Sequence, residues 1–325
     1  FWLLLVLWEM ARQLDFYLTQ DSINNMFIIK YKKIFISIST VLVVLSIISF
    51  FIFKPTVGID FKGGALTEVA YTTERPTVEV VEEKLQTLEL GSVLIQPTGE
   101  LGYIIKSRDL NETEHVDLLE ALSLDGKNSL EEKSFNSIGS SVGRALTSTA
   151  ITAVILVSLA IICFIAFAFR GVSKPVSSWR YGFIAIVTLL HDVIIPAGIF
   201  TVLSNYYGVE VDTLFVVAIL TILGLSVSDT IVIFDRIREN LKEENLNKIN
   251  FSEVVGHSLD QSYARSISTS MTVILVLLAL VFFGPVSTKY FALMLTAGMF
   301  LGTYSSICLA SPLLVLTEEW QKKDK

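Results

Sequence analysis

Six long apolar runs limit the fold of this chain more than any other feature of its sequence. Each run approaches or exceeds the about 20 apolar residues that a helix needs to cross a bilayer. A mean hydropathy of +0.61, with 52% hydrophobic residues, is also too apolar for a soluble domain of 325 residues. The sequence therefore predicts an α-helical polytopic membrane protein with six transmembrane helices, at about Ile34–Phe53, Leu146–Phe169, Tyr181–Leu203, Asp212–Phe234, Ser266–Gly284 and Tyr290–Leu316.

Lysine and arginine residues gather in alternate connections between these runs. They precede the first run, separate the second from the third and the fourth from the fifth, and follow the sixth. Under the positive-inside rule, this pattern predicts that both ends are cytoplasmic and that the polar insert after the first run is outside. The predicted parts are a cytoplasmic N-terminal segment (1–33), a first transmembrane helix (34–53), an extracytoplasmic α+β domain (54–144), a five-helix transmembrane region (145–316) and a cytoplasmic tail (317–325).

Residues 1–25 are expected to be dispensable, either as sequence upstream of the native start or as a tail after a start that lies before Phe1. Phe1 is not an initiator residue, and Met26 precedes a basic flank and the first apolar run. The apolar stretch at residues 1–8 is too short to span a membrane and lacks the basic region of a signal peptide.

The insert alternates strand and helix patterns. Its order, β-α-β-β-α-β, is typical of a ferredoxin-like α+β domain. The insert has neither a phosphate-binding loop nor metal-ligand spacing, and we expect no cofactor and no metal. Cys163 and Cys308 lie in apolar runs and read as small core residues without a disulfide. The predicted strands are Ala65–Tyr71, Ser92–Gln96, Gly102–Ser107 and Glu132–Ile138, and the predicted helices are Thr77–Leu90 and Glu112–Ser123.

Asp229 lies in the fourth apolar run, where its near neighbours are aliphatic or small. A carboxyl group at this depth costs roughly 2.5–3.5 kcal/mol on insertion scales, so it should have a function or a buried partner. Apolar surroundings favour the neutral form of a carboxyl group, and a nearby cation favours the charged form. Asp229 is therefore a candidate proton carrier of a transporter, and a static buried ion pair is the alternative.

Three further residues are candidates for a proton pathway. His191 and Asp192 lie near the middle of the third run, about 16 Å in at 1.5 Å per residue. A His–Asp pair in hydrocarbon is a candidate proton relay, with a structural hydrogen-bonding role as the alternative. Arg265 precedes the fifth run and is a candidate partner of Asp229, whereas the alternative is an arginine that snorkels to the headgroups.

Small residues recur at every fourth position of the sixth run, at Gly298, Gly302, Ser306 and Ala310. Small residues at this spacing allow two helices to pack closely. We expect an interface with other spans, in this chain or in a partner.

A stretch directly after the first run, Gly-Ile-Asp-Phe-Lys-Gly-Gly at 58–64, contains Gly58, Asp60, Gly63 and Gly64. By residue chemistry alone it indicates a turn, because glycine permits positive φ and close backbone approach. The stretch resembles the first signature of the SecF family of protein-export membrane subunits.

A second stretch, at 224–240, is similar to the other signature of that family. It contains Asp229 and ends in Asp-Arg-Ile-Arg-Glu-Asn, with Asp235, Arg236 and Arg238. By residue chemistry alone, arginines at a helix C-terminus indicate a topological anchor. The resemblance extends from about Lys30 to Leu316 and includes the order of six spans with one outside domain.

The resemblance implies a subunit of the Sec machinery that uses the proton motive force, with SecD, to promote translocation of preproteins. In the family, the aspartate at position 229 moves protons and acts together with the arginine at position 265, and a His-Asp pair is common. The implied location is the bacterial cytoplasmic (inner) membrane. The implied partners are SecD as an obligate heteromeric partner, the SecY-E-G channel, the translocating preprotein and lipid, with YajC and YidC as further candidates and no nucleic acid.

Two other functions fit the same pattern. One is half of a resistance-nodulation-division type exporter of small molecules or lipids, although such exporters usually carry both halves and two larger outside domains in one chain. The other is a membrane scaffold without proton flow, which a permanently paired or lipid-facing Asp229 would favour. The sequence has no Walker A pattern, so we expect a proton-driven transport subunit and not an ATP-hydrolysing enzyme.

Overall fold

The computed structural model describes residues 24–124, 126–169, 176–243 and 250–323. These residues contain six helices that are long and apolar enough to cross a membrane, which confirms the predicted number of long apolar helices. The chain divides into two compact units. The helical unit comprises residues up to 55 together with 154–209 and 214–325, and the insert unit comprises residues 56–153 and 210–213. Most of the segment expected to be dispensable, residues 1–25, lies outside the described residues.

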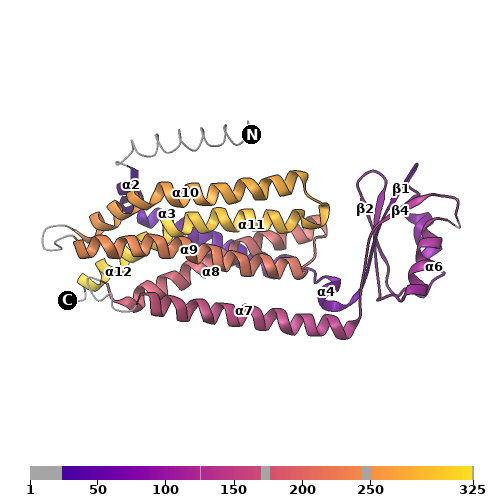
Figure 1. Ribbon diagram of the computed structural model, residues 1–325, viewed down its shortest axis with the longest axis horizontal. Helices are drawn as coiled ribbons and strands as arrows, with labels where there is room; N and C mark the ends of the chain where they lie inside the picture. The colour runs from indigo at the N-terminus through magenta and orange to yellow at the C-terminus, as the bar shows by residue number, and fades with distance from the viewer. Residues whose placement is uncertain (1–23, 125, 170–175, 244–249, 324–325) are drawn as a thin grey trace. The chain divides into compact units, whose positions relative to one another are not determined.

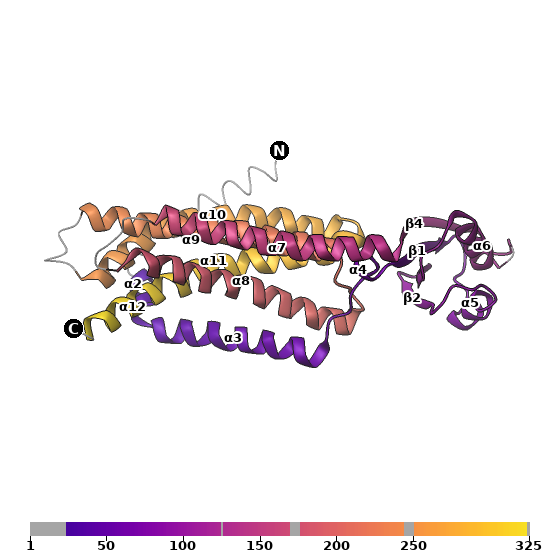
Figure 2. The same cartoon turned by 90° about the horizontal axis from the view of Figure 1, so that it is seen from below.

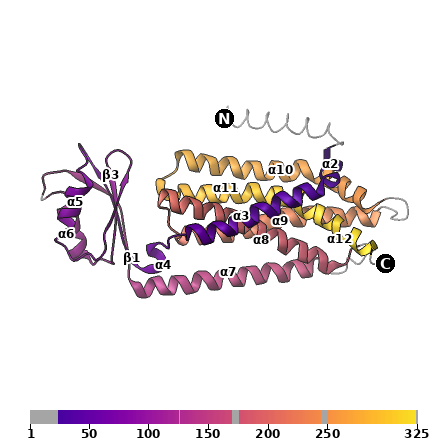
Figure 3. The same cartoon turned by 180° about the vertical axis from the view of Figure 1, so that it is seen from behind.

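Long helices packed side by side form the helical unit (Figure 1). Helix α3 lies against α8 (Figure 3). Helix α11 contacts both α8 and α10 and lies between them (Figure 2). The helices are α2 (Asn24–Lys30), α3 (Lys32–Phe53), α7 (Ser140–Ala168), which begins in the insert unit, α8 (Ser178–Tyr207), α9 (Thr213–Glu243), α10 (Phe251–Phe283), α11 (Val286–Ser305) and α12 (Ser311–Lys323).

Several helices extend beyond the predicted apolar runs. Helix α9 continues to Glu243, past the predicted end at Phe234, and α10 begins at Phe251 and not at Ser266. Backbone hydrogen bonds continue where the side chains become polar, so hydropathy underestimates the length of these helices. The sixth span differs in another way, because the π-helical segment η1 (Ser306–Ala310) joins α11 to α12. The sequence pattern did not predict it.

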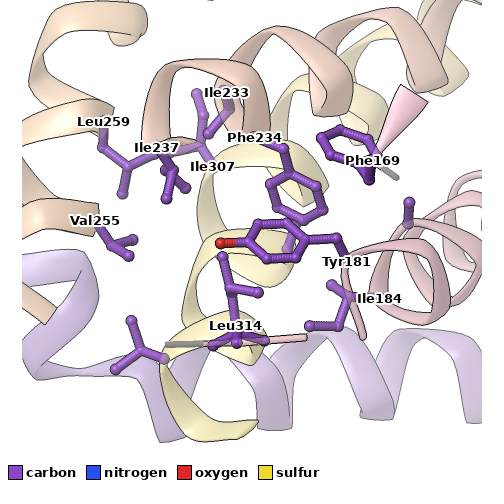
Figure 4. Packing of buried hydrophobic residues seen from close by; sticks show 14 of the residues in the cluster. Phe169, Tyr181, Ile184, Ile233, Phe234, Ile237, Val255, Leu259, Ile307 and Leu314 are labelled. Carbon is purple, nitrogen blue, oxygen red and sulfur yellow. The ribbon is translucent and has the colours of Figure 1, made fainter. Parts of the chain in front are cut away.

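An aromatic cluster joins three helices of the helical unit (Figure 4). The ring of Tyr181 stacks on Phe169 at 5.7 Å between centroids and meets Phe234 edge-on at 5.3 Å. Phe169 directly follows the last residue of α7, Tyr181 lies in the first turn of α8, and Phe234 lies in the second half of α9. Large apolar side chains on the outside are highly exposed, for example Phe51 at 77% and Phe283 at 90%. Such a surface is what lipid or a partner helix would cover.

The insert unit contains a four-stranded antiparallel sheet with two helices between its strands, and the one-turn helix α4 (Ile59–Lys62) precedes the first strand. The strand order is β2-β3-β1-β4, and the element order is the predicted one. Alternate residues of β1 face the core, where the unit buries side chains such as Val69, Leu85 and Leu118. The elements are β1 (Gly64–Tyr71), α5 (Val78–Leu85), β2 (Leu94–Thr98), β3 (Gly102–Ser107), α6 (Glu112–Leu122) and β4 (Leu130–Ile138).

Helix α5 is shorter than predicted, because it ends at Leu85 and not at Leu90. The chain turns directly after the helix, where the Leu90 N–H donates to the carbonyl of Leu88 at 2.8 Å. Leu90 is 2% exposed. On a continued helix, Leu90 would lie about 200° from Leu88 and point away from the core face. Burial of Leu90 therefore favours the turn.

Candidate functional site

Asp192 is the centre of a buried polar contact between three helices. Its side chain in α8 is 0% exposed. Oδ1 lies 2.7 Å from Nδ1 of His191, and Oδ2 accepts hydrogen bonds from Ser226 of α9 and, at 2.6 Å, from Ser305 of α11. Burial of a carboxyl group requires such donors. Pro196 follows one turn later in α8 and lacks the N–H that would bond to the carbonyl of Asp192.

His191 is buried beside Asp192 with one nitrogen unpaired. The side chain is 2% exposed, and Nε2 has no hydrogen-bond partner among the described residues. The imidazole lies nearly parallel to the ring of Tyr304, with 6.3 Å between centroids. The sequence-predicted pair of His191 and Asp192 is therefore a hydrogen-bonded unit with one free ring nitrogen.

Asp229 lies three residues after Ser226 on α9, and its carboxyl group contacts hydroxyl groups. Oδ2 accepts a hydrogen bond from Oγ of Ser270 in α10 at 3.2 Å. Ser270 in turn accepts one from Oγ1 of Thr303 in α11 at 2.6 Å. The side chain is half-buried. Within the described parts of the chain, no lysine, arginine or histidine forms an ion pair with Asp229.

Arg265 is not brought into contact with Asp229. It is an exposed residue in the middle of α10, five positions before Ser270. Five positions rotate the side chain by about 140° on a helix, so Arg265 and Ser270 cannot face α9 together. Across the described residues, no ion pair of Arg265 with Asp229 is present. The prediction that these two residues act together stays a prediction.

Small residues of α11 allow this helix to pack closely on α9, beside Ser226. An added Cβ on Gly298 would lie 2.4 Å from Cγ1 of Ile222, and one on Gly302 would lie 3.3 Å from Cβ of Ser226. Oγ of Ser306 is 3.0 Å from Oγ1 of Thr230. Ser306 also begins the π-helical segment, and such segments occur frequently at functional sites.

The first signature binds the chain segment that leads into α9. The Gly58 N–H donates to the carbonyl of Val211 at 2.8 Å, and Oδ2 of Asp60 accepts from the Thr213 N–H at 2.9 Å. Thr213 is the first residue of α9, so Asp60 caps this helix from a distant part of the sequence. Gly63 has φ +82° and Gly64 has φ +136°, which are conformations that favour glycine.

The end of the second signature joins α9 to its neighbours. Nε of Arg236 donates to Oε1 of Gln261 in α10 at 2.5 Å, and Nη1 of Arg238 donates to the carbonyl of Ala168 in α7 at 3.2 Å. Nδ2 of Asn240 donates to Oγ of Ser258 at 2.8 Å. Asp235 is exposed and lies 3.9 Å from Arg238. Arg236, Arg238 and Asn240 therefore bind α9 to α10 and α7, and the two arginines also place positive charge at this end of α9.

Sequence reasoning missed the hydroxyl groups that complete the site. The sequence does show hydroxyl side chains in otherwise apolar runs, and these could have suggested buried hydrogen bonds. Which groups they bond to depends on how each helix is rotated about its axis. Through the described regions, no group of three or more His, Cys, Asp or Glu residues is arranged to hold a metal ion. The hydroxyl residues are Ser226 and Thr230 on α9, Ser270 on α10, and Thr303 and Ser305 on α11.

Comparison with known proteins agrees with this arrangement. The family model described as "Protein export membrane protein SecD/SecF, C-terminal" matches residues 119–320. The protein translocase subunit SecF of Thermobaculum terrenum is 39% identical over 309 residues, which cover 91% of this chain and 94% of that protein. The chain belongs to the SecF family. Another SecF, from Anaerolinea thermophila, is 34% identical over 89% of this chain and 94% of its own length.

A solved structure has the same fold as this SecF-family chain. The crystal structure of SecDF, a translocon-associated membrane protein from Thermus thermophilus, matches with a TM-score of 0.75 and 28% identity. The match covers 90% of this chain but only 38% of the SecDF chain. SecDF in its super-membrane-facing form matches with a TM-score of 0.63. The SecF family and the six apolar helices make this protein a multi-pass membrane component of Sec protein translocation.

Proposed function

We propose that the protein uses the proton motive force, together with SecD, to promote translocation of preproteins across the bacterial cytoplasmic membrane. The observation that supports this most is the setting of Asp229, whose carboxyl group lies in an apolar bundle and contacts the hydroxyl of Ser270. Such a group can bind and release a proton without first breaking an ion pair. Each proton that crosses supplies roughly 2.3 kcal/mol per 100 mV of membrane potential.

In this proposal Asp229 is the proton carrier, and His191 with Asp192 form a relay beside it. Ser226 supports the connection, because it binds Asp192 and lies three residues from Asp229 on α9. Arg265 is the cation that acts with Asp229 at another step of the cycle. It lies about 7.5 Å along α10 from Ser270, so a rotation of α10 about its axis would turn Arg265 toward Asp229.

The partners in the proposal are SecD and the Sec channel. The chain matches only 38% of the SecDF chain, which supports a second half supplied by a separate SecD subunit. Exposed apolar side chains such as Phe51 and Phe283 provide surface for that subunit or for lipid. The printed description of SecDF as translocon-associated supports the SecY-E-G channel and the translocating preprotein as further partners, with YajC and YidC as candidates.

We further propose that residues 54–144 form a ferredoxin-like extracytoplasmic domain and that both ends of the chain are cytoplasmic. The strand order β2-β3-β1-β4 and the βαββαβ element order support the domain class. Single cysteines at Glu100 and Lys322 should label from opposite sides of the membrane. Labelling of both from one side would contradict this topology.

The decisive experiment measures preprotein export by membrane vesicles that contain the protein with its partner, with and without a proton gradient. Asp229→Asn should abolish the gradient-dependent part of export, because an amide keeps the size of the side chain but binds no proton at relevant pH. The variant should accumulate normally, because it removes the insertion penalty of a charged group. Arg265→Ala should give a similar defect, and the double variant should be little worse than either single one.

Asp235→Asn is the matched control. Asp235 is on the same helix, but its side chain is 69% exposed, so its loss should leave gradient-dependent export unchanged. Full gradient-dependent export by Asp229→Asn would exclude Asp229 as the proton carrier.

A further inference from the structure

Four serines form a row on the buried face of α10. Ser258, Ser262, Ser266 and Ser270 recur at every fourth position and are 0%, 5%, 2% and 2% exposed. Residues at this spacing lie on one face of a helix, about 6 Å apart along its axis. Apolar residues occupy the buried face at the two ends of α10, for example Phe251 and Leu277. The interior face of the helix thus changes from apolar to hydroxylic along the row.

Both ends of the serine row are bonded to α9. At one end Ser270 donates to Asp229, and at the other Nδ2 of Asn240 donates to Oγ of Ser258 at 2.8 Å. The two contacts require α9 and α10 to run antiparallel, and they are separated by 12 positions of α10, about 18 Å. Asn240 also donates to Oε1 of the exposed Gln261 at 2.9 Å. The row therefore extends from the carboxyl group of Asp229 to a polar surface at Gln261.

A hydroxyl group in the middle of the row lacks a partner. Oγ of Ser266 is buried and has no hydrogen-bond partner among the described residues. Between the two end contacts, α9 buries Ile233 and Ile237, which can neither donate nor accept (Figure 4). Buried hydroxyl groups in proteins are generally satisfied, either by protein or by ordered water. Close helix packing alone would be achieved equally well by alanine and does not explain hydroxyl groups at successive turns.

We propose that the serine row holds water molecules that connect Asp229, past the buried Asn240, to the surface at Gln261, and that protons reach or leave the carboxyl group along it. The ligand is water and the hydrated proton. Each hydroxyl or water accepts a proton on a lone pair and gives its own to the next group, so one proton moves along the row and no group changes its net charge. The inference rests on the proposed proton role of Asp229 and assigns its route.

Water access is tested without reference to export. The background chain carries Cys163→Ala and Cys308→Ala, so that Ser266→Cys supplies its single thiol. Membrane vesicles are treated with Ag⁺, the protein is then denatured, and the thiol is alkylated. A thiol that has bound Ag⁺ is protected from alkylation, and we expect this protection for Ser266→Cys. Ser49→Cys is the matched control, because Ser49 is 7% exposed and its hydroxyl already donates to the carbonyls of Ser46 and Gly198. We expect Ser266→Cys to be protected at least tenfold faster than Ser49→Cys. Equal rates for the two would overturn the proposal.

The role of the hydroxyl groups is tested by Ser262→Ala with Ser266→Ala in the vesicle export assay. The double variant should lower gradient-dependent export several-fold and leave gradient-independent export and protein accumulation unchanged. Ser49→Ala should leave gradient-dependent export unchanged. Full gradient-dependent export by the pair, in vesicles where Asp229→Asn abolishes it, would overturn the route and leave the proton role of Asp229 intact. If Asp229→Asn is itself fully active, the proposed function fails, while the Ag⁺ result still reports whether water enters the row.

Discussion

The close approach of Gly298 to Ile222 predicts that Gly298→Ala does not give the stabilisation expected from helix propensity. In an exposed helix, alanine in place of glycine stabilises by about 0.8–1.0 kcal/mol. At Gly298, however, the new Cβ would lie 2.4 Å from Cγ1 and 2.5 Å from Cδ1 of Ile222. Overpacking of a filled interior typically costs about 1–3 kcal/mol. We therefore expect Gly298→Ala to be neutral or to lose up to about 2 kcal/mol of unfolding free energy.

Gly224→Ala is the matched control on the neighbouring helix, because an added Cβ there meets nothing within 4 Å. It should be neutral or stabilising, so the two variants should differ by the overpacking cost of about 1–3 kcal/mol. The assay is denaturant unfolding of the isolated subunit in detergent. A double-mutant cycle with Ile222→Ala isolates the contact, because removal of the isoleucine should cost less in the Gly298→Ala background. Equal stability of the two glycine variants, with additive effects in the cycle, would refute the close packing of α11 on α9.

Three further predictions concern the insert unit. Asp60→Ala removes the acceptor for the Thr213 N–H and should lower the local stability of the first turn of α9 by about 1 kcal/mol. The amides of that turn should then exchange their hydrogens about fivefold faster, and unchanged exchange would exclude the capping role. The hydrogen bonds of Arg108, followed by the backbone N–H of Asn111, lower the pKa of Glu114 from 4.5 to about 2. Because the folded-state pKa of Glu114 is lowered, this stabilisation is present above pH 4.5 and is lost as the pH falls toward about 2. Glu114→Gln should therefore make the unfolding free energy of the insert fall less steeply in this acidic range. The same steepness as in the unchanged protein would contradict the pairing of Glu114 with Arg108. Gly63→Ala should destabilise the insert by at least about 1 kcal/mol in thermal unfolding, because φ is +82° and the new Cβ would lie 2.8 Å from Cα of Ser140; wild-type stability would contradict that geometry.

Much of the architecture follows from the sequence because it depends on local pattern. Runs of apolar residues near the thickness of a bilayer predicted six helices, and alternation with turn residues predicted the element order of the insert. The boundaries were less accurate, as at the start of α10 and the end of α5, because helical hydrogen bonds and the burial of single residues such as Leu90 are independent of hydropathy. Asp229 was identifiable because a carboxyl group in an apolar run is costly wherever the helix packs.

Only the tertiary structure decided which groups meet. The partners of Asp192 and Asp229 are hydroxyl groups on helices distant in sequence, at Ser226, Ser270 and Ser305. Arg265, which the sequence suggested as a partner, is exposed and forms no ion pair with Asp229 among the described residues. A sequence specifies the length and apolar face of each helix, but contacts also depend on the rotation and relative height of neighbouring helices. The rotation and height of each helix are set by the packing of all the helices together, for example where Gly298 and Gly302 let α11 approach α9. The residue pattern of a single helix contains no information about either.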